Sequence, residues 1–528
     1  MRHDTLFALG VLSIFSFGGF SQERAGREST PTVSGSKTIA AHYMTSMVAT
    51  FHPKGKPSRQ NDYLARPLAE QVEISRDFRA AARWDIEQAC IAGVNTFAVW
   101  MYPRMGEINS NDTAFQNMLF GEMQKEKTVQ FYPDFWWFKM DPENWGKIMT
   151  AWGAEPRPTI EAEMRRYGQV LKTWSERFGD VWRKHDGKWI IAMQDHALFK
   201  NVPYAKAAQW LFAPLGGREK VYLKLCRYPS LPRFPNGGEI APDWLAAADA
   251  VFDWSANSSY GDALEMRKQG EALCAASQKE WCPSFAPSFM QSRGGDGTAP
   301  TSPKIYERLG IVSFQDEWME AIRSGAKSVA IITWNDMSED TSLMPEENHG
   351  YAYLRLNRYF ARWFQSGKRP DIEREEILLF HHPQVVEGLE LPGSRKPTES
   401  GPGCSTPPTD FVAVVTFLKK SAEVSVIFHK QVIAKKECPP GYLAWFLYNP
   451  RKQLPPESGL ADTDPVYPSA SDDLAVTILD KPFTDAEVFL EVKRGSEPPI
   501  LFRSQRPIVS AAGRADLTTI GNVFRIER

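Results

Sequence analysis

The sequence predicts an α/β protein in which a (β/α)₈ TIM barrel is followed by a C-terminal β-sandwich domain. Strand-like and helix-like segments alternate over residues 38–364, which is typical of parallel strands joined by helices. No GxGxxG or GxxxxGK[ST] motif follows the first strand, although an open doubly wound sheet would normally carry one there. Beyond residue 410 the helical period disappears, and short alternating runs separated by turn residues replace it, as in a sandwich.

Each expected barrel strand is a short, mainly apolar run bounded by turn or stop residues. The strands are expected at 38–44, 95–101, 128–134, 188–194, 220–225, 250–255, 280–286 and 328–334. The helices that follow them are expected at 78–92, 112–125, 159–178, 204–212, 242–248, 261–277, 311–324 and 351–364. The pair Ala92-Gly93, for example, supplies a helix stop before the second strand.

Composition divides the chain into a signal peptide, a flexible tether, a catalytic barrel, a linker and a β-sandwich domain. These segments are expected at 1–21, 22–37, 38–385, 386–410 and 411–528. Arg2 and the apolar run that follows it are typical of a secretory signal, so we expect a secreted, periplasmic or cell-surface protein. No later stretch approaches about 18 apolar residues, so no membrane span is expected after signal removal.

Charge and motif content exclude several classes of partner and cofactor. The 62 basic and 64 acidic residues give a net charge of −2, so no positive excess is present to attract nucleic acid or an anionic membrane. No CxxC, HExxH or histidine cluster indicates a metal site, and we expect no cofactor and a monomer. The 17 Trp and 31 Phe offer flat faces that suit sugars, although a large aromatic core would also account for part of them.

Polar and aromatic residues follow the expected strands, at the face where barrel enzymes place their active sites. Those expected to bind substrate are His42, Trp100, Trp136, Asp195, His196, Asp253, Trp254, Trp334 and Asn335. Any one of them could instead cap a helix or a turn. Together they bring carboxylates, aromatic rings and histidines to one rim, which is the composition of a carbohydrate site.

The most informative stretch is KSVAIITWNDMSEDTSL, residues 327–343. A buried strand ends there in a Trp, an amide and two carboxylates, Asp336 and Glu339. Polar groups crowded at the end of a buried strand are costly to desolvate and are often functional. The alternative is that Asn335 or Asp336 only caps the next turn.

These motifs resemble glycoside hydrolase family 71, the secreted α-1,3-glucanases or mutanases. The resemblance is carried by AAHYM, ARWDIEQACIAGVNTFAVW, the Asp after the third strand, FDW and above all TWNDMSED. It implies a barrel with a following β-sandwich, inverting hydrolysis of α-1,3-glucan, and catalytic roles for Asp336, Glu339 and Asp134. The sequence departs from the family pattern at Met337, Ser338 and Asp340, which flank the two carboxylates.

An inverting mechanism needs one carboxylic acid and one carboxylate about 6.5–9.5 Å apart. Residues three apart span up to about 10 Å of extended chain, so Asp336 and Glu339 can meet this requirement. The more buried carboxyl is favoured as the acid; without knowledge of burial, Glu339 is assigned as acid and Asp336 as base. The activity that the resemblance to family 71 implies is that of an endo-α-1,3-glucanase. The alternatives are a glycosidase acting on another polysaccharide, such as α-mannan, and a non-catalytic glycan-binding protein.

Overall fold

The computed structural model of the protein describes residues 37–45, 67–101, 111–135, 159–194, 202–227, 240–291, 304–386, 406–450, 465–510 and 517–526. The predicted signal peptide and most of the predicted tether and linker lie outside the described residues.

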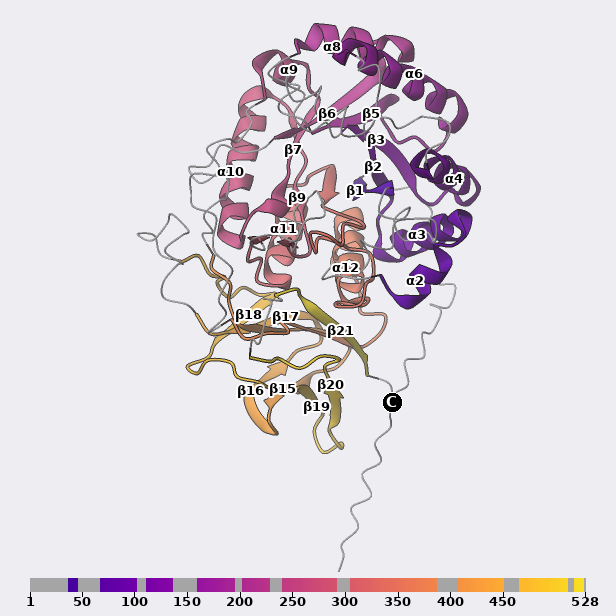
Figure 1. The fold of residues 1–528 in the computed structure, drawn as a ribbon. Coiled ribbons are helices and arrows are strands. Elements are labelled where there is room, and N and C mark those ends of the chain that lie inside the picture. Colours follow the sequence, from indigo (N-terminus) through magenta and orange to yellow (C-terminus); the bar gives the residue numbers. More distant parts are fainter. Residues whose placement is uncertain are drawn as a thin grey trace, which may run out of the picture.

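The larger domain is a barrel of parallel strands (Figure 1), which confirms the predicted fold class. Its strands are β1 (Thr38–Tyr43), β2 (Thr96–Met101), β3 (Gln130–Phe135), β5 (Lys188–Met193), β6 (Val221–Arg227), β7 (Ala250–Asp253), β8 (Glu280–Trp281), β9 (Ser284–Phe285) and β12 (Ser328–Ile331). β8 pairs with β7, and β9, only two residues further along the chain, pairs with β12. β8 and β9 are thus two halves of one strand position, and they close the sheet. A two-residue strand, β4 (Lys184–His185), adds a hairpin to β5.

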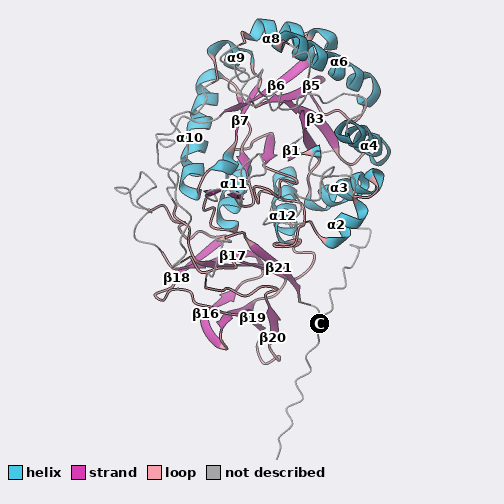
Figure 2. Cartoon of the chain, in the orientation of Figure 1, coloured by secondary structure: helices cyan, strands magenta, loops and turns pink. Residues whose placement is uncertain are grey.

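Helices surround the sheet (Figure 2), and each predicted helix lies within a few residues of its expected position, whereas the short helix at residues 69–74 was not predicted. They are α2 (Ala69–Ile74), α3 (Phe78–Ala92), α4 (Asn111–Glu126), α6 (Ile160–Phe178), α8 (Tyr204–Leu211), α9 (Pro242–Ala247), α10 (Tyr260–Ser277), α11 (Ile311–Arg323) and α12 (Ala352–Ser366). Local signals determine these limits. The side chain of Asp77 caps the start of α3 by accepting from the amide of Arg79, and Gly93 ends α3 in the left-handed region at φ +80°.

The C-terminal domain consists of two sheets. The five-stranded sheet contains β18 (Leu474–Ile478), β17 (Gly441–Tyr448), β14 (Phe411–Leu418), β13 (Glu376–His381) and β21 (Ile520–Arg525). The four-stranded sheet contains β16 (Gln431–Cys438), β15 (Ala422–Phe428), β19 (Val488–Lys493) and β20 (Ile500–Arg503). A short antiparallel pair, β10 (Met290–Gln291) with β11 (Lys304–Ile305), belongs to neither domain sheet.

Both faces of the five-stranded sheet are buried. Along β14, Ala413 and Val415 pack into the barrel's hydrophobic core, whereas Val412 and Val414 between them pack against the second sheet, as the alternation of a strand requires. At the barrel side, Tyr442 stacks on Tyr359 of α12 with ring centroids 4.8 Å apart. The sandwich therefore serves as packing against the barrel helices.

The position of β13 corrects the predicted domain boundary. The sequence analysis assigned residues up to 385 to the barrel, but β13 pairs antiparallel with β14 and β21. The boundary lies between the end of α12 at Ser366 and the start of β13 at Glu376. Residues 376–381 have the apolar pattern of any buried strand, and the strands that pair with them lie far away along the chain. Local periodicity therefore could not predict which sheet they join.

We expect Gly93→Ala to destabilise the barrel more than Gly187→Ala does. Gly93 and Gly187 have nearly the same φ, +80° and +79°, so alanine at either position costs about 1–2 kcal/mol of backbone strain. A Cβ on Gly93 would lie 2.6 Å from Cβ of Ala361, whereas a Cβ on Gly187 meets no atom within 4 Å. Overpacking should add about 1–3 kcal/mol at Gly93 only. Urea unfolding of both variants measures the difference, and equal losses would contradict the tight α3–α12 contact.

Candidate active site at the carboxyl end of the barrel

Three buried polar side chains meet at the mouth of the barrel. His42 of β1 places Nδ1 2.6 Å from Oδ2 of Asp134 on β3, and Nε2 of Gln194, which follows β5, donates to the same oxygen. His42 and Asp134 are fully buried and Gln194 is 1% exposed. Since a carboxylate oxygen accepts, Nδ1 of His42 carries the proton, and this tautomer is assigned from its partner.

Each of these side chains keeps one polar atom without a hydrogen bond among the described residues. The atoms are His42 Nε2, Asp134 Oδ1 and Gln194 Oε1. With the proton of His42 on Nδ1, all three atoms are acceptors. Buried polar atoms are nearly always satisfied in native proteins, so this cluster calls for a ligand or water that offers several donors.

Two tryptophan rings border the cluster. The ring centroid of Trp254, which follows β7, lies 5.2 Å from that of His42 in an edge-on arrangement. The Trp100 ring at the end of β2 lies 5.5 Å from Trp254, and its Nε1 lies 3.4 Å from Nδ1 of His42. Both rings lie on the barrel side of the sheet, where the sequence analysis expected substrate-binding aromatics, and not in the layer that faces the helices.

The loop after β12 carries the two predicted catalytic carboxylates. Oδ1 of Asp336 accepts from the amide and hydroxyl of Ser338, at 2.9 and 2.6 Å, and from the amide of Glu339 at 3.2 Å. The capping role left open by the sequence is therefore real, but it occupies one oxygen of Asp336. Burial raises the pKa of Asp336, and the hydrogen bonds from Ser338 and Glu339 oppose it only in part. Glu339 is half-buried and Asp336 is 4% exposed.

Trp334 and Asn335, two of the predicted substrate-binding residues, bind groups inside the protein. Asn335 accepts from the amide of Met44 at 2.8 Å and donates to its carbonyl at 3.0 Å. The backbone amide of Trp334 donates to the carbonyl of His42 at 2.7 Å. The Trp334 indole is fully buried, and its Nε1 donates to Asp85 of α3. The Asn335 side chain thus joins the segment after β12 to the end of β1, and the Trp334 indole joins it to α3. That these side chains contact substrate stays a prediction.

Asp253 is likewise used inside the protein. Its two oxygens accept from Arg227 at 2.8 and 2.9 Å, and the same guanidinium donates to the carbonyl of Met266. Burial raises the pKa of Asp253, and Arg227 opposes that shift. Both carboxylate oxygens of Asp253 are thus held by Arg227, and that Asp253 binds substrate stays a prediction. The predicted residues Trp136, Asp195 and His196 lie outside the described residues.

Gln194 is the member of the polar cluster that the predicted set of site residues omits. It ends the strand that precedes Asp195 and His196, so its position was visible in the sequence. What the sequence does not show is that the strand directs Gln194 toward Asp134.

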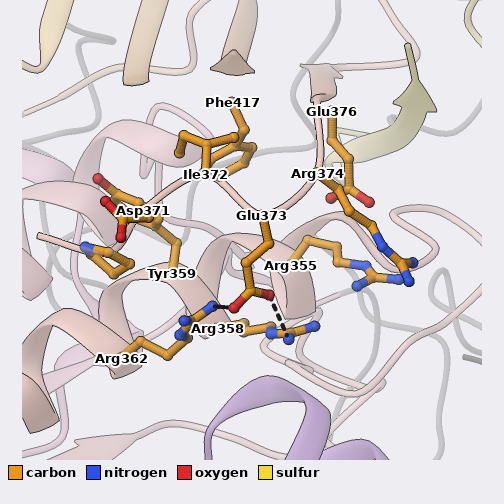
Figure 3. Close-up of a pocket in the computed structure, with 11 residues that line it drawn as sticks. Arg355, Arg358, Tyr359, Arg362, Asp371, Ile372, Glu373, Arg374, Glu376 and Phe417 are labelled. Carbon is orange, nitrogen blue, oxygen red and sulfur yellow. Dashed lines mark hydrogen bonds and ion pairs between the residues drawn. The ribbon is translucent and has the colours of Figure 1, made fainter. Parts of the chain in front are cut away.

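A hollow lies away from this rim, between α12 and the segment that leads into β13 (Figure 3). Within it, the carboxylate of Glu373 is paired with two arginines, 2.7 Å from Arg362 and 3.3 Å from Arg358. None of the strand-end residues described above lines it. We therefore place the candidate site at the barrel mouth and not in this hollow.

Within the described residues, no group of three or more His, Cys, Asp or Glu side chains is arranged to hold a metal ion. In the same part of the chain, no helix is long and apolar enough to cross a membrane.

Comparisons with known proteins give only distant matches. No protein-family model matches the chain, and no curated protein matches it. Among solved structures, a GH99 endo-alpha-mannosidase from Bacteroides thetaiotaomicron is 14% identical, covers 62% of this chain and 97% of its own, and has a TM-score of 0.41. A beta-glucuronidase from Parabacteroides merdae is 9% identical, covers 91% and 49% of the two chains, and has a TM-score of 0.40. A beta-glucuronidase from Bacteroides uniformis is 10% identical, covers 82% and 44%, and has a TM-score of 0.36. At these similarities, function has to be inferred from the geometry of the chain's own site.

We expect Asn335→Ala and Asn95→Ala to destabilise the protein to a similar extent but to differ in activity. Asn335 binds the backbone at the end of β1, and Asn95 binds the amide of Ile39 and the carbonyl of Lys37 at its start. Removing either side chain leaves two backbone groups without their partner, at about 1–3 kcal/mol for each that is buried, although the carbonyl of Lys37 is only part-buried. Since only Asn335 borders the candidate site, only Asn335→Ala should lower kcat. Thermal unfolding and turnover of both variants test this, and equal losses of kcat would contradict the site's location.

Proposed function

We propose that the protein is a glycoside hydrolase that cleaves an α-linked polysaccharide. The observation that carries the proposal is the cluster of three buried acceptors, His42 Nε2, Asp134 Oδ1 and Gln194 Oε1, beside the rings of Trp100 and Trp254. A ligand that satisfies three acceptors must offer several donors, which sugar hydroxyls do and phosphate or carboxylate anions do not. Aromatic rings next to these acceptors suit the C–H faces of a sugar ring.

The two carboxylates of the loop after β12 supply the chemistry in this proposal. Glu339, as a carboxylic acid, gives its proton to the glycosidic oxygen as the bond to the anomeric carbon breaks. Asp336, as a carboxylate, takes a proton from the water that attacks the anomeric carbon from the opposite face. Atoms and charge balance, because the proton lost by Glu339 is replaced by the one that Asp336 accepts.

The assignment of base to Asp336 rests on how its carboxylate is held. Burial alone would favour the more buried Asp336 as the acid. Against this, the donors on Oδ1 fix the group as an acceptor, and a raised pKa makes the carboxylate a stronger base than an ordinary aspartate. We therefore keep Asp336 as base and Glu339 as acid.

The substrate and the cellular setting are part of the proposal. The motif resemblance to family 71 favours α-1,3-glucan, and the signal-like N-terminus favours a secreted, periplasmic or cell-surface enzyme that acts as a monomer. A screen of soluble and insoluble α- and β-glucans and α-mannans, with release of reducing ends as readout, identifies the polymer. Binding without hydrolysis of every polymer would instead indicate a glycan-binding protein.

We expect Asp336→Asn and Glu339→Gln each to lower kcat on the polysaccharide by at least about 10²-fold, since general acid–base help contributes about 10²–10⁴. A glycosyl fluoride of the same sugar needs no protonation of its leaving group. On this substrate Glu339→Gln should therefore regain most of its activity, whereas Asp336→Asn should not. Sodium azide should restore turnover to Asp336→Asn only. Recovery of Asp336→Asn alone on the fluoride would exchange the two roles.

The proposed mechanism also fixes the configuration of the product. With a single attack by water, an α-linked substrate releases the β-anomer first. A retaining mechanism would need a carboxylate nucleophile about 5–5.5 Å from the acid and would release the α-anomer. Proton NMR within minutes of mixing, before mutarotation, distinguishes the two, and an early α-anomer would exclude the roles given to this pair.

A further inference from the structure

A carboxylate lies on the buried face of α3, behind the candidate site. Asp85 is 3% exposed, and its neighbours on the buried face of the helix are the apolar residues Ala82, Ile86 and Ala89 and one amide, Gln88. A charged group on an apolar helix face costs stability unless hydrogen bonds compensate it. Its partners therefore indicate why the residue is there.

Asp85 accepts from two side chains, one on the first strand of the barrel and one on the segment that follows the last strand. The Tyr43 hydroxyl donates to Oδ2, and Nε1 of Trp334 donates to Oδ1 at 3.3 Å. Tyr43 is the neighbour of His42, and Trp334 is two residues before Asp336. Because side chains alternate along a strand, Tyr43 points to the helices while His42 points into the barrel. One carboxylate thus ties together the two strand ends that carry the acceptor cluster and the carboxylate pair.

We propose that Asp85 is a positioning residue that sets the spacing between the His42–Asp134–Gln194 cluster and the Asp336–Glu339 pair. The inference rests on the proposed function, since the spacing matters only if these groups act on one substrate. Asp85 contacts neither group; it acts through Tyr43 and Trp334. The rings of Tyr43 and Trp334 both pack on the ring of Phe97, with centroid distances of 4.7 and 5.3 Å. A shift of one of these two rings therefore displaces the other through Phe97.

The bridge needs the ionised form of Asp85, because both partners are donors. Burial raises the pKa of Asp85 to about 7, although the hydrogen bonds from Tyr43 and Trp334 lower it. Among the described residues, Tyr43 is the titratable group in contact with Asp85, and burial and Asp85 raise the pKa of Tyr43 well above its usual value, so it remains a neutral donor. Below pH 7, protonated Asp85 becomes a donor itself and competes with one of the two bonds. Activity should therefore fall on the acid side with a midpoint near pH 7.

Stability has the opposite pH dependence. The folded-state pKa of Asp85 is higher than the value of 3.8 for an unperturbed aspartate. Its contribution to stability is therefore complete below about pH 4 and is lost as the pH rises through about 7. A variant without this ionisable group should not lose stability as the pH rises through about 7. A purely stabilising role would make activity and stability change with pH in the same direction, whereas a positioning role lets them change in opposite directions.

Two substitutions test the proposal. Asp85→Asn offers one acceptor and one donor, as protonated Asp85 does, so its kcat at pH 8 should already be lowered to the level that wild type reaches on the acid side, with no change near pH 7. Asp85→Leu removes both links and leaves the Tyr43 hydroxyl and Nε1 of Trp334 as buried donors without this acceptor, so its melting temperature at pH 8 should fall, and kcat is measured well below that temperature. Its kcat should drop by about 10–10²-fold, with KM within about twofold, as expected for a small misplacement of reacting groups.

A readout independent of catalysis separates failure of this inference from failure of the proposed function. With 5-fluorotryptophan incorporated, the ¹⁹F resonance of Trp334, identified by its loss in Trp334→Phe, should titrate near pH 7 in wild type and stay constant in Asp85→Asn. A constant resonance in wild type, or full kcat in Asp85→Leu, overturns the role of Asp85. A titrating resonance in a wild-type protein that hydrolyses no glycan supports the bridge and overturns the proposed function.

Discussion

The position of β1 is the constraint on which the candidate site depends. This six-residue strand is held by its neighbours β2 and β12 and by two asparagine side chains that bind its backbone, Asn95 at the start and Asn335 at the end. Because alternate side chains of a strand face opposite sides, a shift of one residue would turn His42 toward the helices. The site depends on the register of β1 with β2 and β12. Only in this register do the polar cluster, the tryptophan rings around it and the bridge to Asp85 form.

The order of helices and strands could be predicted because its signals are local. Caps and stops such as Asp77 and Gly93 lie within a few residues of the ends they determine. Sheet membership is different. β13 pairs with β14 and β21, so that Glu376, for example, lies opposite Phe417 on one side and Arg525 on the other. Both partner strands come much later in the sequence. No periodicity within residues 376–381 contains that information.

Similar limits apply to the site. The rim position of His42, Trp100, Asp134, Trp254 and Asp336 follows from the barrel rule that strand ends carry function. The direction of a side chain at or beyond the end of a strand does not. The sequence therefore could not show that Trp334 binds Asp85 of α3, that Asn335 binds the end of β1, or that Asp253 binds Arg227 of β6. Asp85 was part of a motif that resembled a family, but its partners appear only once α3 packs on β1 and the segment after β12.

The five-stranded sheet of the sandwich packs one apolar face on the barrel and the other on the four-stranded sheet. We therefore expect the two domains to fold as a single unit. A chain cut at the predicted barrel limit would keep β13 but lose β14 and β21, which leaves the backbone groups of that strand unpaired. It would also uncover the face of α12 on which Tyr442 stacks, a surface prone to aggregation. Heating should accordingly melt both domains in one cooperative step, and limited proteolysis should not release a stable isolated barrel.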